Sequence, residues 1–249
     1  MLTIGFLIPT TSKNTKWTSH LENNLLTMLI PSLIKTISDN YHCRIYVGID
    51  VDDQLLNNQQ FVESINNSIK DIPDISCQIV IFEQFKKYHV TSRWNYLLKM
   101  AFDENCDYFY QCGDDIIFMN QNWIDESIKL LQSNNNIGIS GPTDVDHAKS
   151  ITINRIGLHI PSGLLTQCML SREHYLIFGF LFNPIIKNWW CDTWLNEIYK
   201  PNLIFRLENH FYKNAGGTPR YKINIKDRTK WIELANQDKN KLISYLKSL

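Results

Sequence analysis

The first 140 residues alternate between short apolar runs and longer segments whose apolar residues recur at helical spacing. The run from Leu2 to Ile8 ends at Pro9, as expected of a buried strand. Similar runs cover residues 43–49, 77–82, 108–110 and 137–139, and helical patterns cover residues 18–37, 58–70, 91–104 and 122–132. Pro31 should kink or split the first helix. The alternation predicts an α/β fold with a largely parallel central sheet flanked by helices.

The pattern loosens in the second part of the chain. Residues 150–185 are rich in Ile, Leu, Phe and Gly and predict further strands, and residues 187–200 predict a helix. Residues 202–225 read as strands and loops, and Thr229 to Leu249 as a last helix that packs on the domain. The alternative for this last helix is a surface that docks a partner or a membrane. We find no repeat and no long linker, so we expect one domain over residues 1–249.

Charge and cysteine usage narrow the function classes. Lys and Arg total 25 and Asp and Glu total 25, so the chain lacks the basic excess of a typical nucleic-acid binder. No run of about 18 apolar residues predicts a membrane span, and the first residues read as a strand and not as a signal peptide. The six cysteines are scattered, with no Cys-x-x-Cys pair. We therefore expect reduced thiols in a cytoplasmic protein with no nucleic-acid partner.

Acidic residues recur where strands end. Asp50 follows the second predicted strand, and Asp114 and Asp115 follow the fourth. In a parallel sheet these ends share the edge at which ligands bind. Carboxylate oxygens suit Mg²⁺ or Mn²⁺, and a substrate diphosphate can supply the remaining ligands. The alternative is an ordinary Gly-Asp-Asp turn.

Four sequence blocks, taken in order, resemble the nucleotide-sugar half of GT-A glycosyltransferases, close to the family 2-like group. The blocks are Phe6 to Thr10, Ile45 to Asp50, Arg93 to Asn95 with Ala101, and Tyr108 through Gly113-Asp114-Asp115 to Ile116. The likeness covers residues 2–145 well and the rest loosely. The Asp-x-Asp signature of that fold lacks its first acid here, which leaves the metal contact mainly to Asp115.

The resemblance implies a GT-A, Rossmann-like fold with a nucleotide-sugar half at residues 1–145, an acceptor half at 146–228 and a C-terminal helix at 229–249. The residues that would bind the nucleotide sugar are Pro9, Thr10, Thr11, Asp50, Arg93 and Asp114. The first three would line the base pocket. Asp50 would accept a hydrogen bond from a base N–H, and Arg93 would contact the nucleotide and hold the carboxylate on the base side. Asp114 would bond ribose or sugar hydroxyls, and Asp115 would coordinate Mn²⁺ or Mg²⁺.

Tryptophans surround one acid in the acceptor half. Trp189, Trp190 and Trp194 lie close to Asp192 in sequence. Tryptophan faces stack on sugar rings, and a carboxylate can take a proton from an acceptor hydroxyl. The resemblance implies that Asp192 is the general base and that the tryptophans bind the acceptor, with Glu197 as the substitute base. The alternative is a helix N-terminal Asp beside core tryptophans.

Other candidates are less specific. The resemblance implies His210 as an additional metal ligand, with a structural histidine as the alternative. Residues 216–221 could form a loop that closes over the diphosphate, with Arg220 neutralising charge, or an ordinary connection. A second metal site at Asp144, Asp146 and His147 is a further alternative to a surface loop. Asp52 and Asp53 read as a solvated turn.

The sequence therefore predicts a metal-dependent glycosyltransferase. It would move a sugar from a nucleoside-diphosphate sugar, most simply a UDP sugar, to the hydroxyl of a glycan or other acceptor, with inversion. One alternative is a catalytically inactive nucleotide- or sugar-binding module of the same fold. Another is a sugar nucleotidyltransferase, but residues 9–14 lack the Gly-rich loop that such an enzyme needs. The sugar, the acceptor and the oligomeric state are not specified by the sequence.

Overall fold

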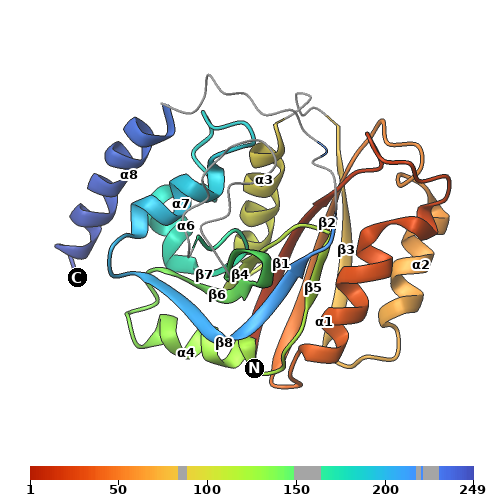
Figure 1. The fold of residues 1–249 in the computed structure, drawn as a ribbon, viewed down its shortest axis with the longest axis horizontal. Helices are drawn as coiled ribbons and strands as arrows, with labels where there is room; N and C mark the ends of the chain where they lie inside the picture. Colours follow the sequence, from red (N-terminus) through yellow and green to blue (C-terminus); the bar gives the residue numbers. More distant parts are fainter. Residues whose placement is uncertain (84–88, 149–163, 217–219, 221–229) are drawn as a thin grey trace.

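The computed structural model describes residues 1–83, 89–148, 164–216, 220 and 230–249 (Figure 1). The described residues contain the strands β1 Leu2–Thr10, β2 Tyr41–Asp50, β3 Ile75–Phe82, β4 Tyr108–Gln111, β5 Ile116–Phe118, β6 Ile139–Asp144, β7 Cys168–Ser171 and β8 Ile204–Asn214. The helices are η1 His20–Glu22, η2 Leu25–Leu29, α1 Ile30–Thr36, α2 Gln59–Ile69, α3 Val90–Asp103, α4 Trp123–Gln132, α5 Val145–Ala148, α6 Arg172–Phe178, α7 Cys191–Tyr199 and α8 Lys230–Leu246.

All described strands join one sheet in the order β3-β2-β1-β4-β7-β6-β8-β5. Strands β3, β2, β1 and β4 are parallel to one another, and so are β6 and β8. Strands β7 and β5 run antiparallel to their neighbours. The sheet is therefore mixed and mostly parallel, as the sequence predicts, and it continues without a break from the first half of the chain into the second.

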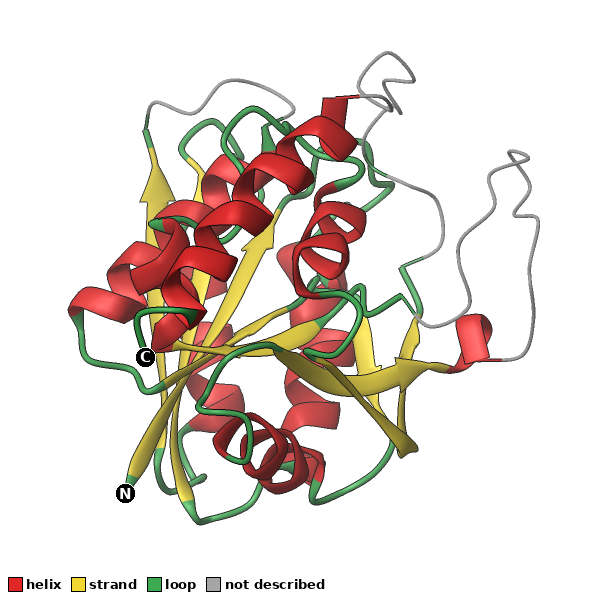
Figure 2. Ribbon diagram, turned by 90° about the vertical axis from the view of Figure 1, so that its left-hand side faces the viewer, coloured by secondary structure: helices red, strands yellow, loops and turns green. Residues whose placement is uncertain are grey.

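Helices cover both faces of this sheet (Figures 1 and 2). On one face, η2, α1, α2 and α4 pack in one apolar core with the alternate β1 residues Ile4, Phe6 and Ile8. On the other face, α3, α6, α7 and α8 share a second core with Leu7. Because each face has its own core, β1 is apolar along nearly its whole length, which is typical of a central parallel strand.

The structure confirms most of the predicted elements and corrects two details. The helical segment predicted over 18–37 is split, as expected of a helix that contains Pro31, into η1, the π-helical turn η2 and α1, with Pro31 in the first turn of α1. The short strand β5 is absent from the sequence prediction. Within 150–185, where further strands were expected, the described residues form β7 followed by α6.

The C-terminal helix α8 packs on α6 and α7, as predicted. It buries Leu234, Ala235 and Leu242. Asp238 on the same face is 2% exposed, and one of its carboxylate oxygens accepts a hydrogen bond from the Asn183 side chain at 2.6 Å. None of the described helices is long and apolar enough to cross a membrane. All six cysteines are free thiols.

Candidate functional site

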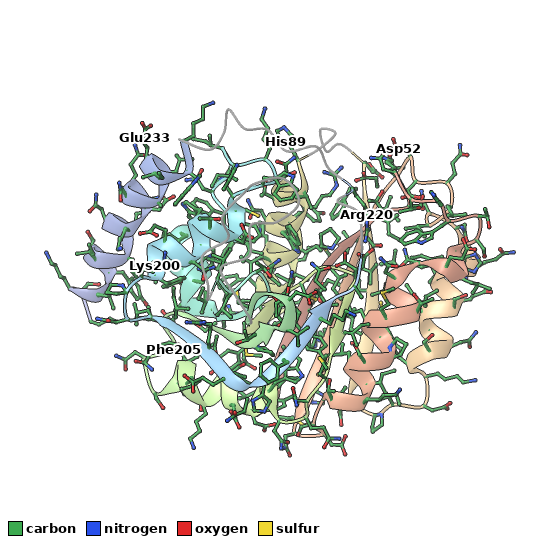
Figure 3. All side chains as sticks on the ribbon, in the orientation of Figure 1. Asp52, His89, Lys200, Phe205, Arg220 and Glu233 are labelled. Carbon is green, nitrogen blue, oxygen red and sulfur yellow. The ribbon has the colours of Figure 1, made fainter. Side chains whose placement is uncertain are left out.

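The acidic residues singled out by the sequence meet at one edge of the sheet. Strands β1, β2 and β4 are parallel, so their last residues, Thr10, Asp50 and Gln111, end at the same side. Figure 3 shows Asp52 and Arg220 at this edge, whereas Phe205 of β8 lies far from it. The chain therefore gathers its strand-end carboxylates where a parallel sheet can bind a ligand.

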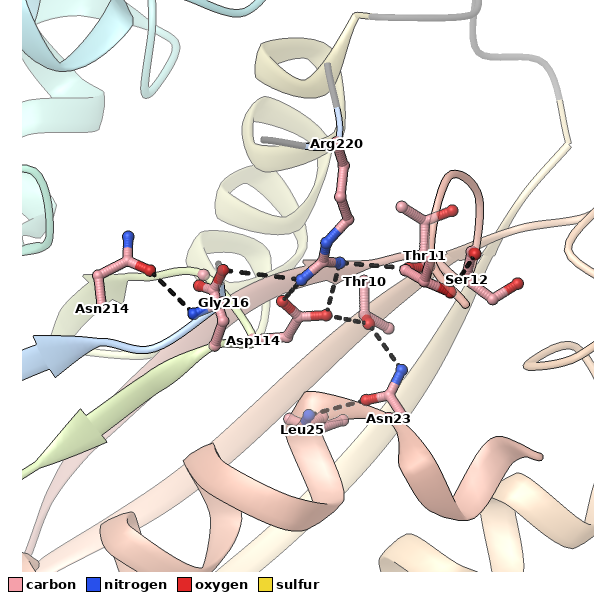
Figure 4. Close-up of polar contacts among 12 residues, drawn as sticks. Thr10, Thr11, Ser12, Asn23, Leu25, Asp114, Asn214, Gly216 and Arg220 are labelled. Carbon is pink, nitrogen blue, oxygen red and sulfur yellow. Dashed lines mark hydrogen bonds and ion pairs between the residues drawn. The ribbon is translucent and has the colours of Figure 1, made fainter. Parts of the chain in front are cut away.

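Asp114 lies at the centre of this edge and is 2% exposed. Its Oδ2 accepts hydrogen bonds from Thr10 Oγ1 at 2.5 Å and from Arg220 Nη1 at 2.9 Å. Arg220 Nη2 donates to Oδ1, so the guanidinium hydrogen-bonds both carboxylate oxygens of Asp114 (Figure 4). A buried carboxylate needs such a partner, because an uncompensated charge is expensive to keep out of water.

Further contacts hold Arg220 in place. Its Nη1 also donates to the backbone oxygen of Thr11 at 3.2 Å, and its own backbone oxygen accepts from the Asn14 side chain at 3.0 Å. The guanidinium carbon lies 5.5 Å from the ring centre of Trp17, within cation–π range. Arg220 therefore joins a C-terminal segment to the loop after β1. The rest of the predicted loop, residues 217–219 and 221, lies outside the described residues.

Asp115 shares this environment but keeps a partly exposed carboxylate. Its Oδ2 lies 3.7 Å from Arg220 Nη2, and its backbone oxygen accepts from Ala215 N at 2.9 Å. A Cβ atom at Gly216 would collide with the Asp115 carboxylate, so glycine is needed there. Burial and the neighbouring charge of Asp114 raise the pKa of Asp115 to about 6, although Arg220 acts in the opposite direction.

Gln167 is a site residue that the sequence analysis did not single out. It is 8% exposed, and its Oε1 accepts a hydrogen bond from Gly113 N at 2.9 Å. This bond fixes the backbone immediately before the acid pair. A lone glutamine ahead of a short strand carries no motif, and its partner is 54 positions away, so local sequence offers no signal for it.

Asp50 lies next to this centre and is held by two cations. Its Oδ1 accepts from Arg93 Nε at 2.7 Å and lies 2.6 Å from Arg93 Nη2. Lys13 Nζ donates to Oδ2 at 3.2 Å. Arg93 Nη1 also bonds the backbone oxygen of His89, the residue before α3, at 2.9 Å. Through its contact with Asp50, Arg93 ties the start of α3 to the end of β2. The structure thus brings Arg93 to Asp50 as the sequence analysis expects, while their contact with a nucleotide stays a prediction.

The prediction of a solvated turn is wrong for Asp53, which is 2% exposed. Its Oδ2 accepts from Thr11 Oγ1 at 3.0 Å and from Ser12 N at 2.7 Å, and its Oδ1 accepts from Ser12 Oγ at 2.5 Å. The carboxylate replaces the water that these groups would otherwise bind, which is why it can be buried. Asp53 thereby fixes the loop that follows β1, including Thr11 of the predicted base pocket. Pro9 is half-buried in β1, and Thr10 beside it is 5% exposed.

Asp192 lies in the first turn of α7 and is half-buried. Its Oδ1 accepts from Thr193 N at 2.7 Å. One turn later, Asn196 bonds the Asp192 backbone oxygen and both backbone groups of Leu165. Leu165 is two residues from Gln167, so this chain of contacts links α7 to the acidic turn. The substitute base, Glu197, instead pairs with Lys200 at 3.0 Å.

The predicted tryptophan cluster divides into two groups. Trp189 and Trp190 are half-buried beside Asp192 and stay candidates for acceptor binding. Trp194 is 0% exposed and belongs to the core formed by α3, α6, α7 and α8. Because it presents no surface to a ligand, its predicted role in acceptor binding is corrected to a structural one.

His210 is not placed to be a metal ligand beside Asp115. In the antiparallel pair of β5 and β8, Ile116 faces Asn214 and Phe118 faces Tyr212. Asp115 therefore lies at one end of β5 and His210 beyond the other, more than about 10 Å apart at the usual rise of a strand. His210 is 8% exposed, and its Nδ1 lies 3.5 Å from Glu126 Oε2 on α4. The structural alternative holds.

The described residues contain no cluster of three or more His, Cys, Asp or Glu side chains that could hold a metal. Any cation at this edge would rest on Asp115, because both oxygens of Asp114 are bonded by Arg220 and Thr10. Asp115 is suited to hold such a cation. A carboxylate whose raised pKa reflects burial beside another acid is stabilised by a cation. The alternative site at Asp144, Asp146 and His147 includes a side chain outside the described residues.

Comparison with known proteins places the fold. The sequence matches no protein-family model and no curated protein. Among solved structures, residues 1–349 of S. aureus TarS in complex with UDP are similar, with a TM-score of 0.61 and 14% identity over 95% of this chain and 65% of that one. The mannosyltransferase PcManGT from Pyrobaculum calidifontis, in complex with GDP-Man and Mn²⁺, has a TM-score of 0.54 and 11% identity over 85% of this chain and 56% of that one.

These likenesses establish the fold and leave the activity open. The chain has a GT-A-like glycosyltransferase fold, which confirms the fold class that the sequence predicts. It spans less than two thirds of either of these structures. At 11% and 14% identity, the ligands named for those proteins are properties of those proteins.

Proposed function

We propose that this chain is a glycosyltransferase that transfers a sugar from a nucleoside-diphosphate sugar to an acceptor hydroxyl. The observation that carries the proposal is the gathering of Asp50, Asp114 and Asp115 at the carboxyl edge of a sheet with this fold. Solved structures of similar fold include a complex with UDP and one with GDP-Man and Mn²⁺. A UDP sugar is the donor we favour, and a cytoplasmic location agrees with the six free thiols.

The proposed donor half spans residues 1–145. Pro9, Thr10 and Thr11 line the base pocket, and Asp50, oriented by Arg93, accepts a base N–H. Asp114 would bond the ribose or sugar hydroxyls in place of a hydrogen bond from Arg220, which now donates to both of its oxygens. Arg220 lies against both acids and carries the positive charge nearest to where a diphosphate would lie. It therefore lowers the electrostatic cost of bringing an anionic donor to an acidic edge.

A divalent cation, Mn²⁺ or Mg²⁺, is part of this proposal. Asp115 would hold it, and phosphate oxygens and water would complete its ligands, because Mg²⁺ is commonly bound through one or two carboxylates plus substrate phosphates. When bound, such an ion supplies Lewis-acid stabilisation of the departing phosphate. Gly216 leaves the space that the Asp115 carboxylate occupies.

The acceptor half, residues 146–228, supplies the base. Asp192 takes the proton of the acceptor hydroxyl while the acceptor oxygen forms a bond to the anomeric carbon. The bond from that carbon to the phosphate oxygen breaks, and its electron pair leaves with the nucleoside diphosphate. Attack from the face opposite to the leaving group inverts the anomeric centre. Trp189 and Trp190 offer flat apolar surfaces for the acceptor beside this carboxylate.

A second candidate is a module of the same fold that binds a nucleotide or sugar without transfer. Arg220 favours it, because the guanidinium already occupies both oxygens of Asp114 and lies against Asp115. This leaves one carboxylate to hold a cation. A sugar nucleotidyltransferase has no such support, since the loop after β1 is fixed by Asp53 and lacks glycine.

Thermal shift with UDP, GDP, dTDP and CMP, each with and without Mn²⁺, tests donor binding, because a ligand of the native state raises the melting temperature. Hydrolysis and transfer assays with the matching sugar nucleotides follow. Metal-dependent binding together with turnover supports the transferase. Binding without turnover on any acceptor supports the module, and no nucleotide binding rejects both.

A further inference from the structure

Lys13 shares Asp50 with Arg93 but binds it differently. The guanidinium of Arg93, with a side chain 9% exposed, bonds Oδ1 of Asp50 at 2.7 Å. The ammonium of Lys13, with a side chain 37% exposed, lies 3.2 Å from Oδ2 and only 2.5 Å from Oδ1 of Asp52. The buried Arg93 thus holds Oδ1 of Asp50, and the more exposed Lys13 donates a longer hydrogen bond to Oδ2.

The backbone carrying Lys13 is fixed by the buried Asp53. The Asp53 carboxylate bonds both the backbone N–H and the hydroxyl of Ser12, and Lys13 N donates to Thr11 Oγ1 at 3.1 Å. Asp52 then holds the Lys13 ammonium from the solvent side. The position of the ammonium beside Asp50 is therefore built by three separate contacts.

The two groups have opposite hydrogen-bonding characters. Burial lowers the pKa of Lys13, but hydrogen bonds and charge from Asp52 and Asp50 outweigh it and raise the pKa above its usual value. Lys13 is therefore an ammonium at neutral pH, and an ammonium only donates. The ionised Asp50 carboxylate only accepts. A donor and an acceptor lie side by side, 3.2 Å apart, at the edge proposed to hold the base.

We propose that Lys13 is a specificity-determining residue that reads the nucleobase together with Asp50. The pair is complementary to a ring edge on which a carbonyl adjoins an N–H: the carbonyl accepts from Lys13, and the N–H donates to Asp50. Uracil, thymine and guanine carry such an edge. Cytosine presents a bare ring nitrogen beside an amino group, which sets a lone pair against the carboxylate, and adenine has no carbonyl.

This inference rests on the proposed function, because it requires a nucleotide at this edge. It adds a selection rule for the donor: nucleoside diphosphates of uracil, thymine or guanine bind, and those of cytosine and adenine are rejected. In this arrangement Arg93 orients the Asp50 carboxylate. Lys13 discriminates between the bases, because a carboxylate alone also accepts hydrogen bonds from the amino groups of cytosine and adenine.

Calorimetry with UDP, dTDP, GDP, CDP and ADP in the presence of Mn²⁺ tests the rule. For the wild-type chain, we expect at least one of UDP, dTDP and GDP to bind about tenfold or more tightly than CDP and ADP, because only their bases can accept the charged hydrogen bond from Lys13 while donating to Asp50. Lys13→Met should reduce that preference to about threefold or less, and Lys13→Arg, which keeps a cationic donor, should retain most of it. Lys16→Met, a change of exposed lysine on the same loop, is the matched control and should keep the wild-type ranking.

The outcomes separate the inference from the proposed function. Nucleotide binding with an unchanged base ranking in Lys13→Met would overturn the role of Lys13 and leave the proposed function standing. Wild-type preference for CDP or ADP would overturn the selection rule. Wild-type chain that binds none of the five nucleotides rejects the proposed function, and the inference with it. Melting of each variant without ligand confirms that it is folded.

Discussion

Arg220 and Asp114, 106 positions apart in the chain, form a bidentate ion pair. The Asp114 side chain is 3% exposed and that of Arg220 is 13% exposed. The pair joins the strand-end acid of the first half of the chain to a segment that follows β8. The two halves of the proposed enzyme are therefore coupled through a buried charge as well as through the continuous sheet.

Arg220→Met should lower the free energy of unfolding by about 3 kcal/mol, because it leaves the Asp114 charge buried without its cation. Urea denaturation at neutral pH measures this change. Arg206→Met, an exposed arginine on β8, should change stability by less than about 0.5 kcal/mol. Adding Asp114→Asn to Arg220→Met should restore part of the loss, and a double mutant that is simply additive would contradict the buried pair.

Asp115→Asn should abolish the part of nucleotide binding that depends on a divalent cation. An amide oxygen is a weaker ligand for Mn²⁺ or Mg²⁺ than a carboxylate, whereas the base-side contacts at Asp50 and Arg93 are unchanged. The measurement is the UDP-induced thermal shift with Mn²⁺ and with EDTA. We expect a larger shift with Mn²⁺ than with EDTA in the wild type, and equal shifts in the variant. His210→Gln, more than about 10 Å away beyond the far end of β5, should behave as wild type. A Mn²⁺ effect that persists in Asp115→Asn would rule out this residue as the metal ligand.

Asp192→Asn should reduce sugar transfer by about 100-fold or more, because proton removal by a placed base typically contributes that much. Nucleotide affinity should stay within about twofold, since Asp192 lies in α7 and outside the proposed donor pocket. Glu197→Gln distinguishes the two candidate bases: its carboxylate pairs with Lys200, and transfer should be retained. Loss of transfer in Glu197→Gln, with activity kept in Asp192→Asn, would reverse the assignment.

The positions of the strand-end acids could be predicted because they follow from two local facts. Apolar runs mark the buried strands, and parallel strands end at one edge, so Asp50 and Asp114 are expected on the same edge of the sheet. The pairing of Arg93 with the Asp50 carboxylate is implied only by the family resemblance, and the structure shows the two side chains in contact. The strand-end acids thus need periodicity and topology, whereas the role of Arg93 needs the resemblance.

The errors arise where the three-dimensional surroundings of a side chain decide its role. Trp190 and Trp194 are four residues apart, one helical turn, yet Trp190 precedes α7 in a left-handed conformation and Trp194 points into the core. Composition alone does not separate them. The distance of His210 from Asp115 depends on the register of β5 and β8, and the three residues of β5, Ile116–Phe118, are too few for the sequence to predict a strand. The sequence predicts a solvated turn at Asp53 because its partners, Thr11 and Ser12, are about 40 positions away.

His174 should make the protein less stable as the pH falls from about 6.5 to 4. The ring is 1% exposed, with Nδ1 2.8 Å from the Tyr199 hydroxyl and Nε2 3.1 Å from the Leu181 backbone oxygen. Burial lowers its pKa to about 4. Below about pH 6.5 the histidine of the unfolded chain binds a proton, whereas His174 in the folded chain stays neutral down to about pH 4. The contribution of His174 to the free energy of unfolding is therefore fully present above pH 6.5 and is lost progressively below it, by up to about 3 kcal/mol.

Denaturant unfolding between pH 7.5 and 4 measures this loss as a difference between the wild type and His174→Gln, because carboxylates titrate in both. We expect the variant to be less stable at pH 7.5 and to show a shallower decline below pH 6.5. Equal slopes in the wild type and His174→Gln would mean that His174 is not held neutral in the core.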